Sequence, residues 1–216
     1  MRKLYPIFLD IEGKKAVVIG GGPVAARKAG TLAEAGASVT IISPELSPET
    51  AALVKGGSVS HIPRKYSSGD LEGASVAVAA TGDPDANIAI TDEAKSAGVP
   101  VNSARPPSAG DFFVPSTINR GGLTVAISTA GGCPALAKRL KGDLDTFLGR
   151  EYGPFLEFLE EARTAIKAGI TDESARALAL TRLVESDLIE GFKGDRGDAL
   201  ARGRAMLDGL LSSPEK

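Results

Sequence analysis

Residues 16–28 read AVVIGGGPVAARK, an apolar run that stops at three glycines and continues into residues that favour a helix. This order predicts a strand, a tight turn and a helix N-terminus. The spacing Gly20-x-Gly22-x-x-Ala25 is a form of the dinucleotide-binding fingerprint. Gly20 permits the turn, and Gly22 lets the backbone approach a pyrophosphate. Pro23 suits the first turn of the helix, whose free N–H groups would face the negative charge.

The chain after this fingerprint supports the same interpretation. Residues 32–44 read LAEAGASVTIISP, which predicts a helix end at Gly36 and then a second apolar strand. Two strands with a helix between them form the βαβ unit that a dinucleotide-binding fold needs. We interpret the glycine loop as a nucleotide site, with a packing turn that binds no ligand as the alternative.

The composition excludes several functional classes. The 216 residues carry a net charge of −2 and are 43% hydrophobic, so nothing favours a nucleic-acid surface. No apolar run approaches the length of a membrane span, and Asp10 and Glu12 interrupt any signal-peptide core. Cys133 is the only cysteine, which excludes an internal disulfide and a cysteine-based metal cage. These features predict a cytoplasmic protein.

The rest of the chain divides into three kinds of segment. To about residue 102, strands separated by helices predict a Rossmann-type α/β fold with a parallel sheet. Residues 112–128 hold two short β segments, which predict a small β unit or an inter-subunit strand. From Pro134 onward, apolar stripes at helical spacing predict a C-terminal helical domain. We expect these stripes, including the first at Leu136, Leu140, Leu144, Phe147 and Leu148, to pack in a core.

Polar residues at strand ends are the candidates for cofactor contacts, because ligands of open parallel sheets lie outside the carboxyl ends of the strands. Ser43, followed by Pro44, stands where an acidic group usually meets the ribose, and Glu45 could also reach it. No arginine stands there for a 2′-phosphate, so we predict NAD rather than NADP. Thr81 and Asn102 are expected at the nicotinamide end, although Thr81 could simply terminate its strand.

Few residues are candidates for catalysis. Asp111 lies beside aromatic residues at the end of a loop, where a carboxylate could be partly desolvated and act as a general base. His61 is the only histidine and is expected to be structural, because it lies in a short apolar strand. We expect Cys133 to be inert, since a lone cysteine is rarely a nucleophile. No set of residues predicts a metal site.

Five stretches together resemble the precorrin-2 dehydrogenase/sirohydrochlorin ferrochelatase family, which also forms the N-terminal module of siroheme synthases. They are residues 4–9 (LYPIFL), 18–28 (VIGGGPVAARK), 79–81 with Asn87, 101–116, and 128–137 (STAGGCPALA). The similarity covers residues 4–150 strongly and the helical tail loosely. We expect a free-standing form, because the methyltransferase domain of fused synthases does not follow.

The resemblance implies a homodimer with three parts in each chain. These are an NAD-binding Rossmann domain (1–113), a dimerisation element with a linking helix (114–146), and a helical domain (147–216). It implies NAD-dependent oxidation of precorrin-2 to sirohydrochlorin and, in bifunctional members, insertion of ferrous iron to give siroheme. The residues expected to bind NAD are Gly20, Gly21, Gly22, Pro23, Val24, Ser43, Pro44, Thr81 and Asn102.

The chain departs from the family's pattern where other members read Val-Asn-x-x-Asp. Here residues 101–105 read VNSAR, and Arg105 cannot act as a base because its guanidinium stays protonated. We expect Arg105 to bind a substrate carboxylate in a bidentate fork. Either Asp111 supplies the missing base, or the chain has kept dehydrogenation and lost metal insertion. The family's catalytic serine maps to Ser128 or to Thr129.

Two other functions stay open. A small Rossmann domain with an appended helical domain also suits an NAD-binding regulatory or sensor module without catalysis. The other alternative is an NAD-dependent oxidoreductase that acts on an unrelated small anion. The short-chain dehydrogenase type is disfavoured, because no Tyr-x-x-x-Lys pair follows the fifth strand.

Overall fold

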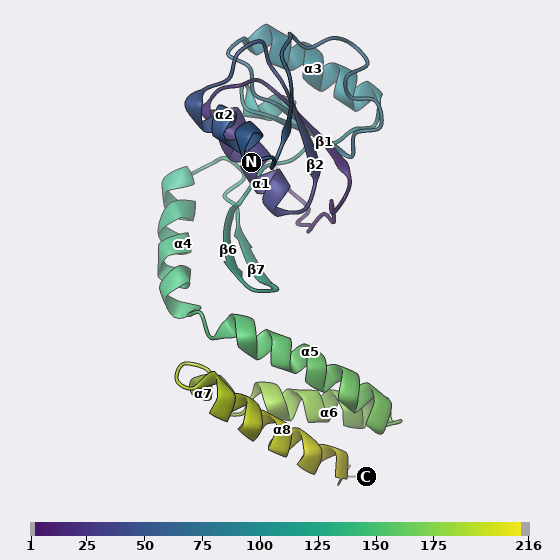
Figure 1. Ribbon diagram of the computed structural model, residues 1–216, viewed down its shortest axis with the longest axis vertical. Helices are drawn as coiled ribbons and strands as arrows, with labels where there is room; N and C mark the ends of the chain where they lie inside the picture. Colours follow the sequence, from purple (N-terminus) through teal and green to yellow (C-terminus); the bar gives the residue numbers. More distant parts are fainter. Residues whose placement is uncertain (1–2, 213–216) are drawn as a thin grey trace. The chain divides into compact units, whose positions relative to one another are not determined.

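The computed structural model describes residues 3–212, which form two compact units (Figure 1). The first unit runs to Val114 and includes Ala130–Gly132. The second unit holds Pro115–Thr129 and the chain from Cys133 onward.

The first unit is built on a five-stranded parallel sheet with the strand order β3-β2-β1-β4-β5. The strands are β1 (Lys15–Ile19), β2 (Ser38–Ile42), β3 (Ser60–Ile62), β4 (Val76–Ala79) and β5 (Val101–Ser103). The chain moves outward from β1 to β3 and then crosses back to β4 on the other side of β1. This reversal between β1 and β4 is the switch point at which doubly wound sheets bind ligands.

Helices cover both faces of the sheet. They are α1 (Pro23–Glu34), α2 (Pro48–Lys55) and α3 (Pro84–Ser96), followed after β5 by the short 3₁₀ helix η1 (Pro107–Ala109). Val18 packs in the core under α1, and its neighbour Val17 packs in the core of the opposite face. Because side chains alternate along a strand, a strand buried on both faces must be apolar throughout, as residues 16–19 are.

The second unit contains a hairpin and helices. The hairpin pairs β6 (Ser116–Arg120) antiparallel with β7 (Leu123–Ile127). The helices are α4 (Pro134–Phe147), α5 (Tyr152–Gly169), α6 (Glu173–Val184), α7 (Leu188–Gly191) and α8 (Arg196–Ser212). Phe155, Phe158 and Leu183 lie in the core that α5 to α8 share. The parallel sheet, the hairpin and the helices confirm the predicted fold class.

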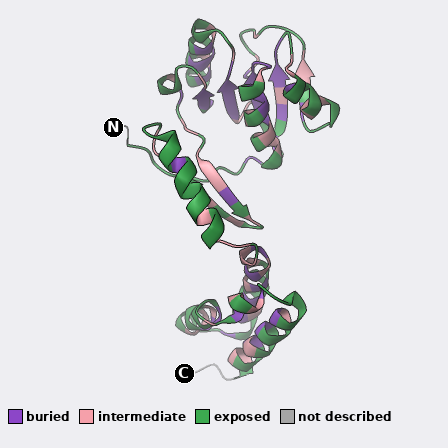
Figure 2. Ribbon diagram, turned by 90° about the vertical axis from the view of Figure 1, so that its left-hand side faces the viewer, coloured by how far each residue is buried: buried purple, intermediate pink, exposed green. Residues whose placement is uncertain are grey.

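Helix α4 differs from the expectation of core packing. Its stripe residues Leu136, Leu140 and Phe147 are 48%, 39% and 72% exposed, and Ala137 is its one buried residue. Figure 2 shows this helix almost entirely as exposed surface, in contrast to the strands of the parallel sheet. The core prediction was wrong for these residues, because periodicity shows that a helix has an apolar face and not what covers it.

Arg120 ties the hairpin to the end of α4. Its Nε donates to the carbonyl oxygen of Leu148 at 2.8 Å, and one terminal nitrogen donates to the carbonyl and carboxylate oxygens of Asp145, both at 3.0 Å. The guanidinium therefore satisfies carbonyl groups that the end of the helix leaves without partners. No helix among residues 3–212 is long and apolar enough to cross a membrane.

Candidate functional site

The first two glycines of the loop between β1 and α1 are required by the fold itself. Gly20 has φ of +120°, and a Cβ there would overlap the carbonyl of Ala80 at the end of β4. A Cβ on Gly21 would overlap the carbonyl of Glu45 and lie 2.7 Å from the Ser43 hydroxyl. The loop thus packs directly against the segments that follow β2 and β4.

Gly22 is different, because no described residue occupies the space that a Cβ would take there. Its φ of −84° and ψ of 179° suit any residue, and a Cβ there would have no atom within 4 Å. It is the N-cap residue of α1, and this helix has no side-chain cap and no acidic residue in its first turn. By contrast, Ser47 caps α2 and Asp83 caps α3, and each of those helices has an acid in its first turn. The open space and the uncapped N–H groups fit an anion such as a pyrophosphate.

A hollow of about 350 Å³ lies beside this loop. It is lined by Gly21, Gly22, Ser43, Glu45, Leu46 and Ser47. Its position after β2 is where a dinucleotide fold receives the adenosine ribose. Of the residues predicted from the sequence, Gly21, Gly22 and Ser43 therefore line one hollow, and Pro44 is exposed next to Ser43.

Ser43 is held by its neighbours. Its hydroxyl donates to the carbonyl oxygen of Glu45 at 2.7 Å, and its own carbonyl accepts a hydrogen bond from His61 Nε2 at 2.9 Å. Since the hydroxyl proton is already used, Ser43 can offer a ribose only an oxygen lone pair. Glu45 is exposed at the same hollow, and its carboxylate can accept hydrogen bonds from ribose hydroxyl groups. His61 has the structural task that its strand context predicted.

The end of β4 is fixed by Asn87, a fully buried residue of α3. Its Oδ1 accepts hydrogen bonds from the Thr81 amide at 2.9 Å and from the Thr81 hydroxyl at 2.8 Å. Its Nδ2 donates to the Thr81 carbonyl oxygen at 3.2 Å. The Thr81 amide nitrogen would in turn lie 3.1 Å from a Cβ on Gly20. In the sequence, only the family resemblance pointed to Asn87. Its contact with Thr81 could not be predicted, because the turn between β4 and α3 brings the two residues together.

The open edge of β5 is covered by residues 110–112. The Asp111 amide donates to the carbonyl oxygen of Val101 at 2.7 Å, and the Asp111 carboxylate accepts the Val101 N–H at 3.2 Å. Asn102, which is 7% exposed, donates through Nδ2 to the carbonyl oxygen of Phe112 at 2.8 Å. Asp111 therefore has a structural partner in Val101, the first residue of β5, although Asp111 is exposed to solvent.

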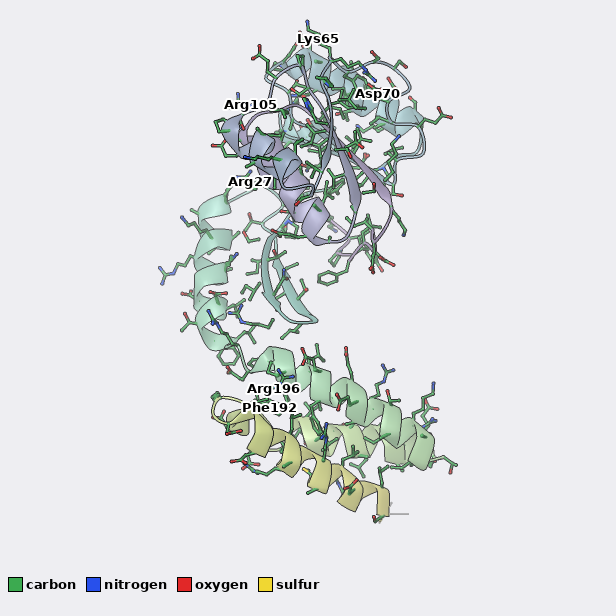
Figure 3. All side chains as sticks on the ribbon, viewed as in Figure 1. Arg27, Lys65, Asp70, Arg105, Phe192 and Arg196 are labelled. Carbon is green, nitrogen blue, oxygen red and sulfur yellow. The ribbon has the colours of Figure 1, made fainter. Side chains whose placement is uncertain are left out.

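Arg105 and Ser128 lie in different units. Arg105 follows β5, so it belongs to the same carboxyl edge of the sheet as Thr81, and it is exposed (Figure 3). Within residues 3–212 no hydrogen bond or ion pair engages its guanidinium. Ser128 is exposed after β7, and the neighbouring Thr129 hydroxyl accepts the Cys133 N–H at 3.1 Å before α4 begins.

A lysine with an unusual pKa lies on α1. Burial and, to a lesser extent, the positive charge of Arg27 together lower the pKa of Lys28 from 10.5 to about 8. Both residues follow the glycine loop by one turn of helix. They add positive charge to the helix whose N-terminus is uncapped.

Comparison with known proteins supports a nucleotide-binding role for the first unit. Residues 7–116 match the family described as "Putative NAD(P)-binding". A siroheme synthase from Thioalkalivibrio sulfidiphilus is 36% identical over 195 residues, which are 90% of this chain and 40% of that protein. One from Chromobacterium violaceum is 35% identical over 200 residues, 92% of this chain and 43% of that protein. The chain thus spans about two fifths of the length of these curated relatives.

A solved structure covers the chain more completely. The protein described as "SirC, precorrin-2 dehydrogenase" matches with a TM-score of 0.74 and 28% sequence identity. The match covers 97% of this chain and 100% of that one. Both units of the present chain therefore have counterparts in one protein of similar size.

Proposed function

The chain belongs to the NAD(P)-binding family that residues 7–116 match, and from this premise we propose that it oxidises precorrin-2 to sirohydrochlorin with NAD. The observation that carries the proposal is the vacant space at Gly22, before the uncapped N-terminus of α1. It is supported by the similarity to the solved precorrin-2 dehydrogenase over nearly the whole chain. The reaction is a step of siroheme biosynthesis, which agrees with the names of the siroheme synthase relatives.

The preference for NAD over NADP rests on the charge of the hollow. None of the described residues that line it is basic, and Glu45 carries a carboxylate there. A 2′-phosphate would add negative charge next to this group. Two like charges 4 Å apart repel by about 1 kcal/mol even in water, so NAD is the better fit.

The nicotinamide of NAD, when bound, would accept the hydride that leaves the substrate. The chain's part is to bind and orient. Thr81, fixed by Asn87, follows β4, and Asn102 lies within β5, near the edge of the sheet where that ring would lie. Arg105 offers a guanidinium that no other residue in the described range 3–212 engages, and it would bind carboxylates of the substrate in a bidentate fork.

The proton that leaves with the hydride needs an acceptor. Asp111 is the carboxylate proposed for this, together with Ser128 as a polar contact to the substrate. Asp111 is exposed, and its bond from the Val101 N–H occupies only part of the capacity of a carboxylate, which can accept several hydrogen bonds. Iron insertion would require a base to remove two pyrrole protons, and Arg105 stands at the position where the family has its carboxylate.

We also propose that two copies of the chain associate. The exposed stripe of Leu136, Leu140 and Phe147 on α4 supports this, because large apolar side chains at regular spacing are typical of a covered surface. The two-stranded hairpin adds open strand edges in the same unit. A cytoplasmic location is proposed as well, since a reducing compartment keeps a thiol such as that of Cys133 free.

The experiment that tests the function is anaerobic conversion of precorrin-2, followed by absorbance, with NAD and with NADP in parallel. Formation of sirohydrochlorin that depends on NAD supports the proposal, and a preference for NADP would refute the cofactor assignment. Ferrous or cobaltous ions are then added to test whether metal insertion exceeds the spontaneous rate. NAD binding without any turnover would favour the sensor module instead.

A further inference from the structure

A buried hydroxyl holds the glycine loop from the side opposite to the proposed pyrophosphate. Thr50, in the first turn of α2, has no exposed surface. Its Oγ1 donates to the carbonyl oxygen of Gly21 at 2.8 Å and has a longer contact with the carbonyl oxygen of Gly22 at 3.3 Å. These contacts join residues 29 and 28 positions apart in the sequence. Thr50 is therefore a tertiary partner of the loop and not a local cap.

The hydrogen bonds around this hydroxyl have one consistent direction. Because the only Thr50 hydroxyl proton goes to Gly21, the Ser47 hydroxyl must be the donor in the 3.1 Å contact between the two side chains. The Ser47 oxygen also accepts the Thr50 N–H at 3.4 Å, and the Ser47 N–H donates to the Gly21 carbonyl oxygen at 2.7 Å. The Gly21 carbonyl thus receives two donors, which is the number of its lone pairs.

This arrangement fixes the direction of one peptide plane. In a trans peptide the carbonyl of Gly21 and the N–H of Gly22 point in opposite directions. With the carbonyl held toward α2, the N–H of Gly22 is turned away from α2, and it has no acceptor in the part of the chain that the structure describes. This free N–H belongs to Gly22, the residue before α1 that has open space where a Cβ would lie.

From this geometry we infer that Thr50 is a positioning residue for dinucleotide binding, which keeps the Gly22 N–H aimed at the pyrophosphate. The inference rests on the proposed binding of NAD. Ser47 lines the hollow proposed for the adenosine ribose, so the Ser47–Thr50 pair also joins the two halves of the site. Without the Thr50 hydroxyl, the peptide plane between Gly21 and Gly22 can rotate. Binding of the pyrophosphate then has to fix the orientation of this plane, which weakens the affinity.

The test compares three variants of the full chain. Thr50→Val keeps the shape and removes the hydroxyl, whereas Thr50→Ser keeps the hydroxyl. The matched control is Thr91→Val, because Thr91 is equally buried and its hydroxyl also donates to a backbone carbonyl, that of Asn87 at 2.7 Å. For each protein, the NAD dissociation constant is measured by calorimetry, and amide hydrogen exchange over residues 20–28 is measured without ligand.

We expect Thr50→Val to weaken NAD binding about five- to tenfold, since one hydrogen bond that orients the loop is lost. Exchange over residues 20–28 should become at least threefold faster in this variant, and Thr50→Ser and Thr91→Val should stay within twofold of the unaltered protein in both measurements. Binding of the Thr50→Val protein within twofold, or a Thr50→Ser protein as weak as Thr50→Val, would overturn the inference. If the unaltered protein binds no dinucleotide, the proposed function fails, and unchanged exchange in Thr50→Val separately refutes the positioning role.

Discussion

Replacing Gly22 by alanine should separate ligand binding from folding. The added Cβ meets no atom of residues 3–212 within 4 Å, and the backbone angles are allowed for alanine. Two small terms act on stability. Alanine restricts the unfolded chain, which stabilises the protein by about 0.4–1 kcal/mol, but it is a poorer residue than glycine before a helix, by an amount of similar size. The free energy of unfolding should therefore change by less than about 1 kcal/mol.

Binding should change much more. The methyl group of Gly22→Ala would occupy the space through which a pyrophosphate approaches the N–H groups of α1. We expect the dissociation constant for NAD to rise at least tenfold, which corresponds to about 1.4 kcal/mol.

The matched variant is Gly20→Ala, which should affect the stability of the fold first. Its Cβ would overlap the Ala80 carbonyl, and φ of +120° is strained for alanine. Strain of this kind costs about 1–3 kcal/mol before the overlap is counted, so the melting temperature should fall by several degrees. The assays are thermal unfolding without ligand and an NAD titration by calorimetry. A Gly22→Ala protein that binds NAD like the unaltered chain, or that unfolds as early as Gly20→Ala, would refute the assignment of the space at Gly22.

Four further substitutions test other parts of the account. Lys28→Met should raise the melting temperature at pH 7, because burial of the charged amine destabilises the folded protein. The pKa of about 8 lies below that of the unfolded chain, so the gain in stability over the unaltered protein should shrink between pH 8 and 10.5. Lys55→Met is the control at an exposed lysine. Arg105→Ala should raise the KM for precorrin-2 severalfold with little change in NAD affinity, as measured by steady-state kinetics; an unchanged KM contradicts the carboxylate contact. Asp111→Asn should lower kcat at least tenfold if Asp111 is the base, and unchanged turnover would leave only its contact with Val101. Leu140→Glu should shift the mass measured by light scattering from dimer to monomer, and a monomeric unaltered protein would refute the association.

Much of the first unit could be predicted from local sequence patterns. The apolar run at residues 16–19, the glycines after it and Pro23 each favour the same strand, turn and helix, and the structure confirms all three. The cap of α3 by Asp83 is also local, because it depends on residues only two or three positions away. Such signals are reliable because the groups that interact are neighbours in the chain.

Other features depended on packing between distant segments. The stripe on α4 has the same periodicity as the buried stripe of α5, yet Leu136 is exposed and Phe158 is buried. Only the tertiary structure decides which helix has a neighbour on its apolar side.

The sequence determined the elements and the position of the glycine loop, since strand alternation, helix capping and turn formation are local. It also carried the family resemblance, through short motifs that need no coordinates. The tertiary structure decided which polar groups meet: Asn87 with Thr81, Asp111 with Val101, and Thr50 with Gly21. The physical reason is the short range of a hydrogen bond, which forms only within about 3 Å. The last of these contacts joins residues 29 positions apart, so it exists only after α2 has packed beside the loop.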